Sequence, residues 1–328
     1  MKEIHNHNLG IMFRREFPPE TLPEFARQTE HAGFDELWVV EDCFYGSGIA
    51  SAATALACTE TLTIGLGIMP AVARNPVFTA MEIATLARIY PGRFLPGIGH
   101  GMEKWMRQIG AFPSSQLAAL EETTLAVRRL LAGECFSYDG DQIQLNQVEL
   151  VHPPEVVPPV SLGVRGPKSL ALSGRLADGT ILAEYASPAY VAWAREQILS
   201  GQREASHPGG HRLTVFVLAC AAGTTAAARQ LLRPQIAAAV ASGKINSQLA
   251  PMGILPQVHE LLASAGREGF EAAMPDEWID QLALAGTPQD WQTALERLFE
   301  AGAGTVVLVP TSGKGPEELE VFARHLWR

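Results

Sequence analysis

The chain has 328 residues, a formal net charge of −10 and a hydrophobic content of 47%. Such a composition can bury a large core and is not that of a disordered protein. The acidity argues against nucleic acid or an anionic membrane as the main partner, because both would be repelled. The N-terminus lacks the features of a signal peptide, and no apolar run approaches the roughly 18 residues of a membrane span. We therefore expect a cytoplasmic protein whose partner is a small molecule.

Four cysteines are present, Cys43, Cys58, Cys135 and Cys220, and none belongs to a C-x-x-C pair. This spacing argues against a zinc ribbon or a thioredoxin-type motif. Reduced thiols in a cytoplasm are the simpler interpretation. We expect no metal site.

Short apolar runs alternate with helical stretches along the whole chain. The runs are apolar at successive positions, as is typical of parallel strands buried on both faces. Eight strands are predicted, at residues 9–13, 36–41, 62–69, 93–99, 160–164, 179–183, 213–220 and 305–310.

The helices between them carry start and stop signals. Residues 18–34 begin with proline and reach Gly33, and residues 75–93 run from Asn-Pro to Pro-Gly. Residues 115–133 have apolar positions at helical spacing and end at Gly133. Residues 287–304 begin with Thr287 as N-cap and Pro288 at the first helical position, and Gly302 follows the helix.

Eight strands alternating with helices predict an α/β fold, a (β/α)8 TIM barrel that spans residues 1–328 as a single domain. Insertions are expected at about 133–159, as a hairpin with a Pro-rich connection, and at 241–275. A doubly wound open sheet is the alternative. The count of eight favours the barrel, and no G-x-G-x-x-G follows the first strand.

In such a barrel the loops that follow the strands build the active site. Phe13 ends the first predicted strand. The second is followed by the acids Glu41 and Asp42 and then by Cys43. Two close acids push each other's pKa values apart, so they could do acid–base work. The alternatives are that the acids cap a helix or pair with arginines, and that Cys43 is a small buried hydrophobe.

The third and fourth strands end in glycine-rich loops. Glycines around Gly67 and Ile68 would let a flat ring lie directly on the backbone, although a simple barrel bulge would explain them too. His100 and Gly101 lie where an imidazole and a backbone amide could face a ligand. A structural histidine is the alternative.

After the fifth strand comes the sequence Val164-Arg165-Gly166-Pro167-Lys168 at the start of a helix. The free amides of a helix start, with two cations beside them, make an anion site. The alternative is that each cation pairs with a surface acid such as Asp178 or Glu184. Phosphate or carboxylate binding is the favoured interpretation.

These stretches, together with the residues around Gly140 and Thr287, resemble the bacterial-luciferase-like superfamily. Within it, the chain is most similar to the branch of coenzyme F420-dependent enzymes that includes methylenetetrahydromethanopterin reductase. The resemblance covers almost the whole chain and rests on the order and spacing of the motifs together.

The resemblance implies a barrel, usually dimeric, that binds a flavin or deazaflavin at the carboxyl ends of its strands. The ring is expected against a bulged third strand with a non-prolyl cis peptide, placed here at Gly67–Ile68. The cofactor-binding residues expected from the motifs and the resemblance are Phe13, Cys43, Gly67, Ile68, His100, Gly101, Val164, Arg165, Gly166, Pro167, Lys168 and Glu184.

The expected function is an oxidoreductase that transfers a hydride between coenzyme F420 and a small organic substrate. Glu41, Asp42 and His100 are the catalytic candidates, because Cys43 occupies the position where many F420-dependent members carry histidine. The alternatives are an FMN-dependent monooxygenase that uses reduced flavin and O2, a catalytically silent flavin-binding barrel, and an unrelated phosphate-binding barrel such as an aldolase. The "RGPK" sequence favours F420 over FMN.

Overall fold

The computed structural model describes residues 7–205, 210–311 and 317–327. The chain divides into two compact units. The central unit comprises Phe13–Ile181 and Ile198–Arg212. The terminal unit comprises Met1–Met12, Leu182–Gln197 and Leu213–Arg328. Among the described residues, no helix has both the length and the apolar character that a membrane crossing requires.

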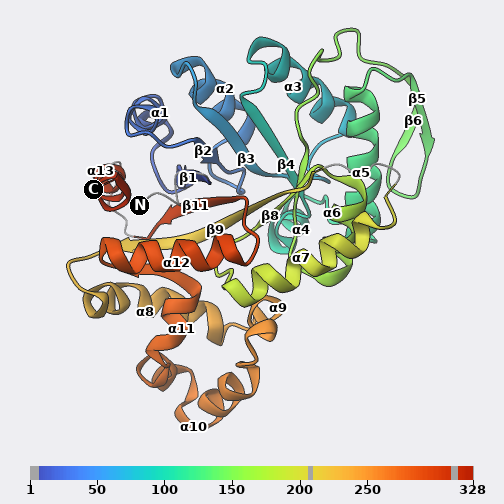
Figure 1. Cartoon of the computed structure of the whole chain (residues 1–328). Helices are drawn as coiled ribbons and strands as arrows, with labels where there is room; N and C mark the ends of the chain where they lie inside the picture. The colour runs from blue at the N-terminus through green and yellow to red at the C-terminus, as the bar shows by residue number, and fades with distance from the viewer. Residues whose placement is uncertain (1–6, 206–209, 312–316, 328) are drawn as a thin grey trace. The chain divides into compact units, whose positions relative to one another are not determined.

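The central unit is built on parallel strands that neighbour one another in the order β2-β3-β4-β7-β8 (Figure 1). Because they are parallel, their carboxyl ends meet at one edge, where the candidate residues are expected. The strands are β2 (Glu36–Val39), β3 (Thr63–Pro70), β4 (Phe94–Gly99), β7 (Ser161–Gly163) and β8 (Gly179–Leu182).

Helices connect these strands, and polar caps start several of them. Asn75 Oδ1 accepts a hydrogen bond from the Val77 amide at the start of α3, and Ser115 Oγ does the same for Ala118 in α5. The helical elements are η2 (Pro19–Thr21), α1 (Leu22–His31), α2 (Gly48–Cys58), α3 (Pro76–Ile89), α4 (Glu103–Gln108), α5 (Gln116–Leu131) and α6 (Pro167–Leu176).

The hairpin predicted between residues 133 and 159 is confirmed as the antiparallel pair β5 (Phe136–Asp139) and β6 (Gln144–Val148). The buried carboxylate of Glu122 in α5 anchors it, since it accepts hydrogen bonds from the amides of Asp141, Gln142 and Ile143 at 2.9–3.2 Å. A buried carboxylate is tolerated here because backbone donors replace its water.

The terminal unit has its own parallel strands in the order β10-β9-β11-β1. Its α12 starts with the predicted Thr287 cap, reinforced by Asp290 in a capping box. The strands are β1 (Asn8–Met12), β9 (Arg212–Ala221), β10 (Ala283–Gly286) and β11 (Thr305–Pro310). The helical elements are α7 (Pro188–Gln202, shared with the central unit), α8 (Thr225–Ala241), α9 (Asn246–Leu249), η3 (Ala250–Met252), α10 (Leu255–Ala273), α11 (Asp276–Leu282), α12 (Pro288–Glu300) and α13 (Glu317–Trp327).

All eight predicted strands are present, with ends within about two residues of the prediction. The sequence missed β10, a four-residue parallel partner of β9. Its residues, Ala-Leu-Ala-Gly, carry no β-branched side chain, so only the pairing with β9 distinguishes them from the end of α11. The region 241–275 is partly helical, as expected, and α10 is kinked at Gly266 (φ +67°).

A buried charge closes the amino end of β2. The Glu36 side chain is 2% exposed, forms an ion pair with Arg212, and accepts a hydrogen bond from Trp38 Nε1 at 2.8 Å. The Trp38 ring lies on Gly65 of β3, where an added Cβ would come within 2.3 Å of the ring. This polar and aromatic contact fixes β2 against β3. β3 is the strand in which the resemblance places Gly67 and Ile68 next to the cofactor ring.

We expect Glu36→Ala to lower the free energy of unfolding by about 3 kcal/mol, because it removes one partner of a buried ion pair and orphans the Trp38 donor. Glu24→Ala is the matched control, since Glu24 pairs with Arg27 in an exposed ion pair worth under about 1 kcal/mol. Urea unfolding of both variants tests this, and equal losses would contradict the role of Glu36.

Candidate functional site

The third strand has the irregularity that was predicted. The register between β3 and β4 shifts between Leu66 and Met69, and the Gly67–Ile68 peptide bond is cis. A second non-prolyl cis bond, Cys43–Phe44, was not predicted. The bulged third strand and the position of its cis bond are therefore confirmed.

The Ile68 side chain packs against glycines of β4 and β7. A Cβ added at Gly163 would come within 2.4 Å of Ile68 Cγ2, and one at Gly99 would lie 2.9 Å from both Ile68 and the Gly163 carbonyl oxygen. At Gly97 an added Cβ would come within 2.6 Å of the Leu66 carbonyl oxygen. We call Gly97, Gly99, Gly163 and Ile68 the glycine seat. Only residues without a side chain fit beside Ile68, so the Ile68 side chain packs directly on the backbone of β4 and β7.

The loop after β4 is tied to the first turn of α6. Gly99 pairs with Gly163 in the sheet, which brings the next residue, His100, close to that turn, and His100 Nε2 lies 3.1 Å from Ser169 Oγ. Burial lowers the pKa of His100 below its ordinary 6.5; the hydrogen bond to the Gln116 backbone opposes this in part, and the charge of Arg165 lowers the pKa a little further. The half-buried imidazole is therefore neutral at pH 7.

The start of α6 has the features of an anion site. Gly166 is its N-cap, and none of the described side chains caps it. The Gly166 backbone is extended, and a Cβ added there would meet no atom within 4 Å. Neither backbone conformation nor packing therefore requires glycine. Arg165 and Lys168 are exposed beside the backbone amides that begin α6, and Val164 is buried.

Asp178 does not serve as partner of these cations. Its Oδ2 forms an ion pair with Arg128 and accepts a hydrogen bond from the Val160 amide at 2.9 Å. Glu184 belongs to the terminal unit, where Gln248 Nε2 donates to its carbonyl oxygen at 2.6 Å. The pairing of Asp178 with Arg165 or Lys168 is therefore excluded, and a cofactor role for Glu184 stays a prediction.

The two acids after β2 differ in their surroundings. Glu41, 11% exposed, lies 2.8 Å from Arg74 Nη1 and accepts a hydrogen bond from the Gly48 amide at the start of α2. Asp42 is half-buried and pairs with Arg15 Nη1 at 2.6 Å. Both acids hold charged partners, so Glu41 is bound into the scaffold while Asp42 keeps contact with solvent.

Two other candidates have surroundings that limit their chemistry. Burial raises the pKa of the Cys43 thiol, and the charges of Glu41 and Asp42 raise it further, so Cys43 is a neutral thiol. Phe13 is buried against Phe17 and Phe25, with ring centroids 5.5 and 5.4 Å away. Their assignment to the cofactor stays a prediction.

Sequence reasoning missed several contacts at this edge. Ser169 lies one residue beyond the "RGPK" sequence. Its hydroxyl is within hydrogen-bonding distance of His100, a contact that the sequence does not indicate. Trp105 was unremarkable in the sequence, but its ring lies 5.7 Å from the Arg15 guanidinium. The placement of glycines at 97 and 99 was the one readable signal for the glycine seat.

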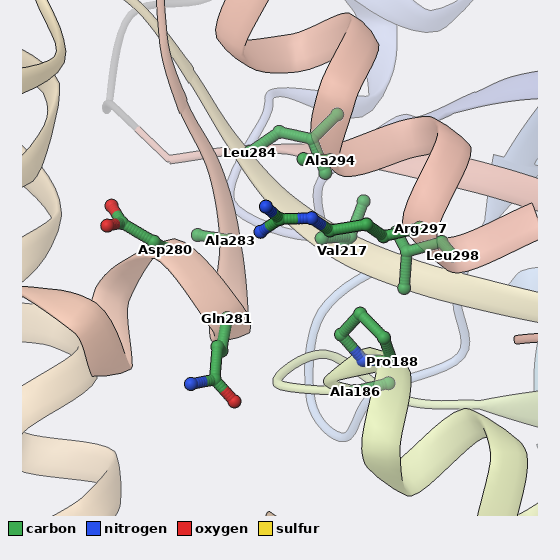
Figure 2. A pocket seen from close by; sticks show the side chains of 10 residues that line it. All are labelled: Ala186, Pro188, Val217, Asp280, Gln281, Ala283, Leu284, Ala294, Arg297 and Leu298. Atoms are coloured by element: carbon green, nitrogen blue, oxygen red, sulfur yellow. The ribbon is translucent and has the colours of Figure 1, made fainter. Parts of the chain in front are cut away.

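A small cavity of about 30 Å³ lies in the terminal unit among α7, β9, β10, α11 and α12. Figure 2 shows its lining, with Arg297 reaching in from α12 and Asp280 contributed by α11. It has room for water but not for a ring cofactor. Among the residues that the structure describes, no group of three metal-ligating side chains forms a metal site.

A family model described as luciferase-like monooxygenase matches residues 4–305. The chain belongs to this family. It is 28% identical to the 5,10-methylenetetrahydromethanopterin reductase of Methanolobus tindarius, over 94% of this chain and 96% of that protein.

Solved structures show the same fold. The F420-dependent tetrahydromethanopterin reductase from Methanopyrus kandleri matches with a TM-score of 0.82 at 20% identity, over 98% of each chain. A monooxygenase from Streptomyces bottropensis matches with a TM-score of 0.73 at 20% identity, over 97% of this chain and 98% of that one. The predicted (β/α)8 barrel is thereby confirmed.

The depressed pKa of His100 predicts how stability depends on pH. Below about pH 6.5 the unfolded chain binds a proton that folded His100 resists, so the free energy of unfolding falls as pH falls and levels off above. His211, whose pKa burial also lowers, adds to this slope. We expect His100→Gln to reduce the loss between pH 7 and pH 5 without abolishing it. Urea unfolding across this range measures the slope, and an unchanged slope would contradict the assignment.

Proposed function

We propose that this luciferase-like barrel is an oxidoreductase that exchanges a hydride between coenzyme F420 and a small organic substrate. The observation that carries the proposal is the uncapped start of α6, with Arg165 and Lys168 beside free backbone amides. Such a start favours an anionic group on the ligand. The similarity to a 5,10-methylenetetrahydromethanopterin reductase and to a tetrahydromethanopterin reductase named for its dependence on F420, over nearly the full length, supports the choice of cofactor.

The residues present fit the anionic tail of such a cofactor. The open space at Gly166 Cβ is a place that a side chain would fill and that a ligand can occupy instead. The amides of Gly166, Lys168 and Ser169 are the donors expected there, because a helix start leaves its first amides without intrahelical acceptors. Arg165 and Lys168 supply the neutralising charge.

The glycine seat fits the ring. Ile68, which is half-buried and packs on Gly99 and Gly163, would support one face of a flat tricycle. When bound, the deazaflavin of F420 would supply the hydride chemistry, while the protein supplies orientation and a dry surface.

The protein's own acids and histidine would then donate or accept the proton that accompanies hydride transfer. Asp42 is the better placed of the two acids, since it is half-buried and reaches solvent, whereas Glu41 is held by Arg74 and by the start of α2. His100 is neutral and lies within hydrogen-bonding distance of Ser169, so it can orient that turn and hold a proton on one ring nitrogen only.

An FMN-dependent monooxygenase is the second candidate function, because the matching family is named for monooxygenases, one structural neighbour is a monooxygenase and another is a monooxygenase in complex with FMN. The same anion site would hold the phosphate of FMN. Cofactor preference therefore decides between the two candidates. We also propose that the protein is cytoplasmic and does not bind nucleic acid. The net charge of −10 supports the second point, because nucleic acid would be repelled.

Titration with F420 and with FMN, followed by tryptophan fluorescence, tests this function. We expect F420 to bind more tightly. Replacing both cations, in Arg165→Ala/Lys168→Ala, should raise the F420 Kd at least about tenfold, because two charge-assisted contacts to the anionic tail are lost. Lys104→Ala, which removes one exposed positive charge from α4, is the control and should leave the Kd unchanged.

Tighter binding of FMN, with substrate-stimulated oxygen consumption, would replace the F420 assignment with the monooxygenase. An unchanged Kd in the double variant would contradict the anion site. Binding of neither cofactor would contradict both candidate functions.

We further propose that the protein is a homodimer that associates through α3. Phe78, Met81 and Ile89 are 61%, 48% and 60% exposed and point to one side of this helix at helical spacing. Three large apolar side chains on one helix face are costly in water. A second copy that presents the same face would cover them in an isologous contact.

Phe78→Asp/Ile89→Asp should convert the dimer to a monomer, since it would bury paired negative charges at the two-fold contact. Light scattering coupled to size-exclusion chromatography measures the mass. Leu231→Asp, at a 68% exposed position on α8, is the matched control and should stay dimeric. A monomeric wild type, or a dimeric double variant, would contradict the proposal.

A further inference from the structure

Two loops and one helix of the central unit meet at one guanidinium. Arg15, after β1, pairs with Asp42, after β2, at 2.6 Å. The same guanidinium lies 5.1 Å from the ring centroid of Tyr45 and 5.7 Å from that of Trp105 in α4. We call Arg15, Asp42, Tyr45 and Trp105 the mouth cluster. It lies at the carboxyl ends of the strands, as the glycine seat does.

The positive charges of these loops are already matched by acids. Arg15 also pairs with Glu16 at 2.9 Å, and Arg14 pairs with the other oxygen of Glu16. Burial alone would lower the pKa of Arg15, but the hydrogen bonds to Asp42 and Glu16 raise it overall. A phosphorylated substrate would have to break these ion pairs to reach a cation, so the loops after β1 and β2 do not suit a dianion.

The loops expose apolar, mostly aromatic side chains that a ligand could contact. Tyr45 is 52% exposed and the neighbouring Phe44 is 65% exposed, while Met102, before α4, is 44% exposed. Exposed aromatic rings grouped at the mouth of a site are typical of ligand recognition and not of a solvated surface. Their flat faces suit a flat conjugated partner.

From these contacts we infer that the mouth cluster binds the organic substrate by stacking, and that this substrate carries a flat, uncharged conjugated ring and no phosphate. The inference rests on the proposed function for the chemistry, because it names the substrate class of that same site. Tyr45 and Trp105 are the binding residues. Arg15 is a positioning residue that holds both rings and Asp42 in place.

Lysine cannot take over this positioning role. A guanidinium is planar, lies against aromatic faces and donates to a carboxylate at the same time, whereas an ammonium is a compact, strongly hydrated charge. Arg15→Lys therefore separates two roles. An arginine that binds a substrate anion would be partly replaced by lysine, but an arginine that orders aromatic walls would not.

The test is ligand-observed NMR with three probes, on the protein with and without F420. Coumarin is the flat neutral probe, camphor is a neutral probe of similar size without a flat ring, and glucose 6-phosphate is the phosphorylated probe. We expect coumarin to bind at least about tenfold more tightly than either of the others.

Variants locate the binding. Arg15→Lys, Tyr45→Ala and Trp105→Ala should each weaken coumarin about tenfold, while Tyr45→Phe, which keeps the ring, should retain it. Arg107→Lys is the matched control, because Arg107 also lies over a ring, that of Phe112 at 3.8 Å, but pairs with Glu103 on the exposed side of α4. F420 affinity and melting temperature should be unchanged in all five variants, which excludes a general loss of structure.

Tighter binding of glucose 6-phosphate, or equal binding of camphor and coumarin, would overturn the inferred substrate class. Full retention of coumarin in Arg15→Lys would overturn the positioning role. Failure of F420 to bind would contradict the proposed function alone. Coumarin binding that depends on Tyr45 and Arg15, and not on Arg165 and Lys168, would still support the mouth cluster in that case.

Discussion

The close approach of Ile68 to the glycines of β4 and β7 is the constraint on which the rest of the site depends. The shift in register before Met69 leaves the Ile68 side chain against Gly99 and Gly163, where no other residue can carry a Cβ. Packing of this density cannot be relaxed by small shifts, because the nearest atoms belong to the backbone or to a β-branched side chain. The strands and the Ile68 side chain must therefore lie close together. This packing fixes the half-buried Ile68 at the carboxyl ends of the strands, where the ring of a flat ligand is expected.

The same pairing organises the anion site. Gly99 lies opposite Gly163, so the residues that follow them in the chain emerge side by side. His100 thereby reaches Ser169 in the first turn of α6, and its neutral ring makes this link without adding charge next to Arg165. One register thus sets both the seat for a ring and the orientation of the helix start that would bind an anionic tail. Neither feature could shift without the other.

Much of this architecture could be predicted because it depends on residues that are close together in the sequence. The buried strands and the helix starts at Asn75 and Thr287 depend on residue type and spacing, and the bulge at Gly67–Ile68 was expected from the resemblance to a known family. What escaped prediction depends on partners distant in sequence. Asp178 was considered as a partner of Arg165 or Lys168, but it pairs with Arg128, 50 residues away in the sequence. The contact of Arg15 with Trp105 joins loops after different strands, and β10 exists only through β9. No window of sequence contains those pairs.

The distribution of charge over the central unit separates two kinds of recognition. At the start of α6 the cations stand beside free amides, which favours an anion. In the loops after β1 and β2, Arg14 and Arg15 pair with Glu16 and Asp42, and the exposed surface there is aromatic. A ligand with one charged end and one flat conjugated ring would find a complementary place for its charge at the start of α6. The two regions therefore suit different ligands. The helix start would orient a cofactor by its charge, and the mouth cluster would select a substrate by its shape.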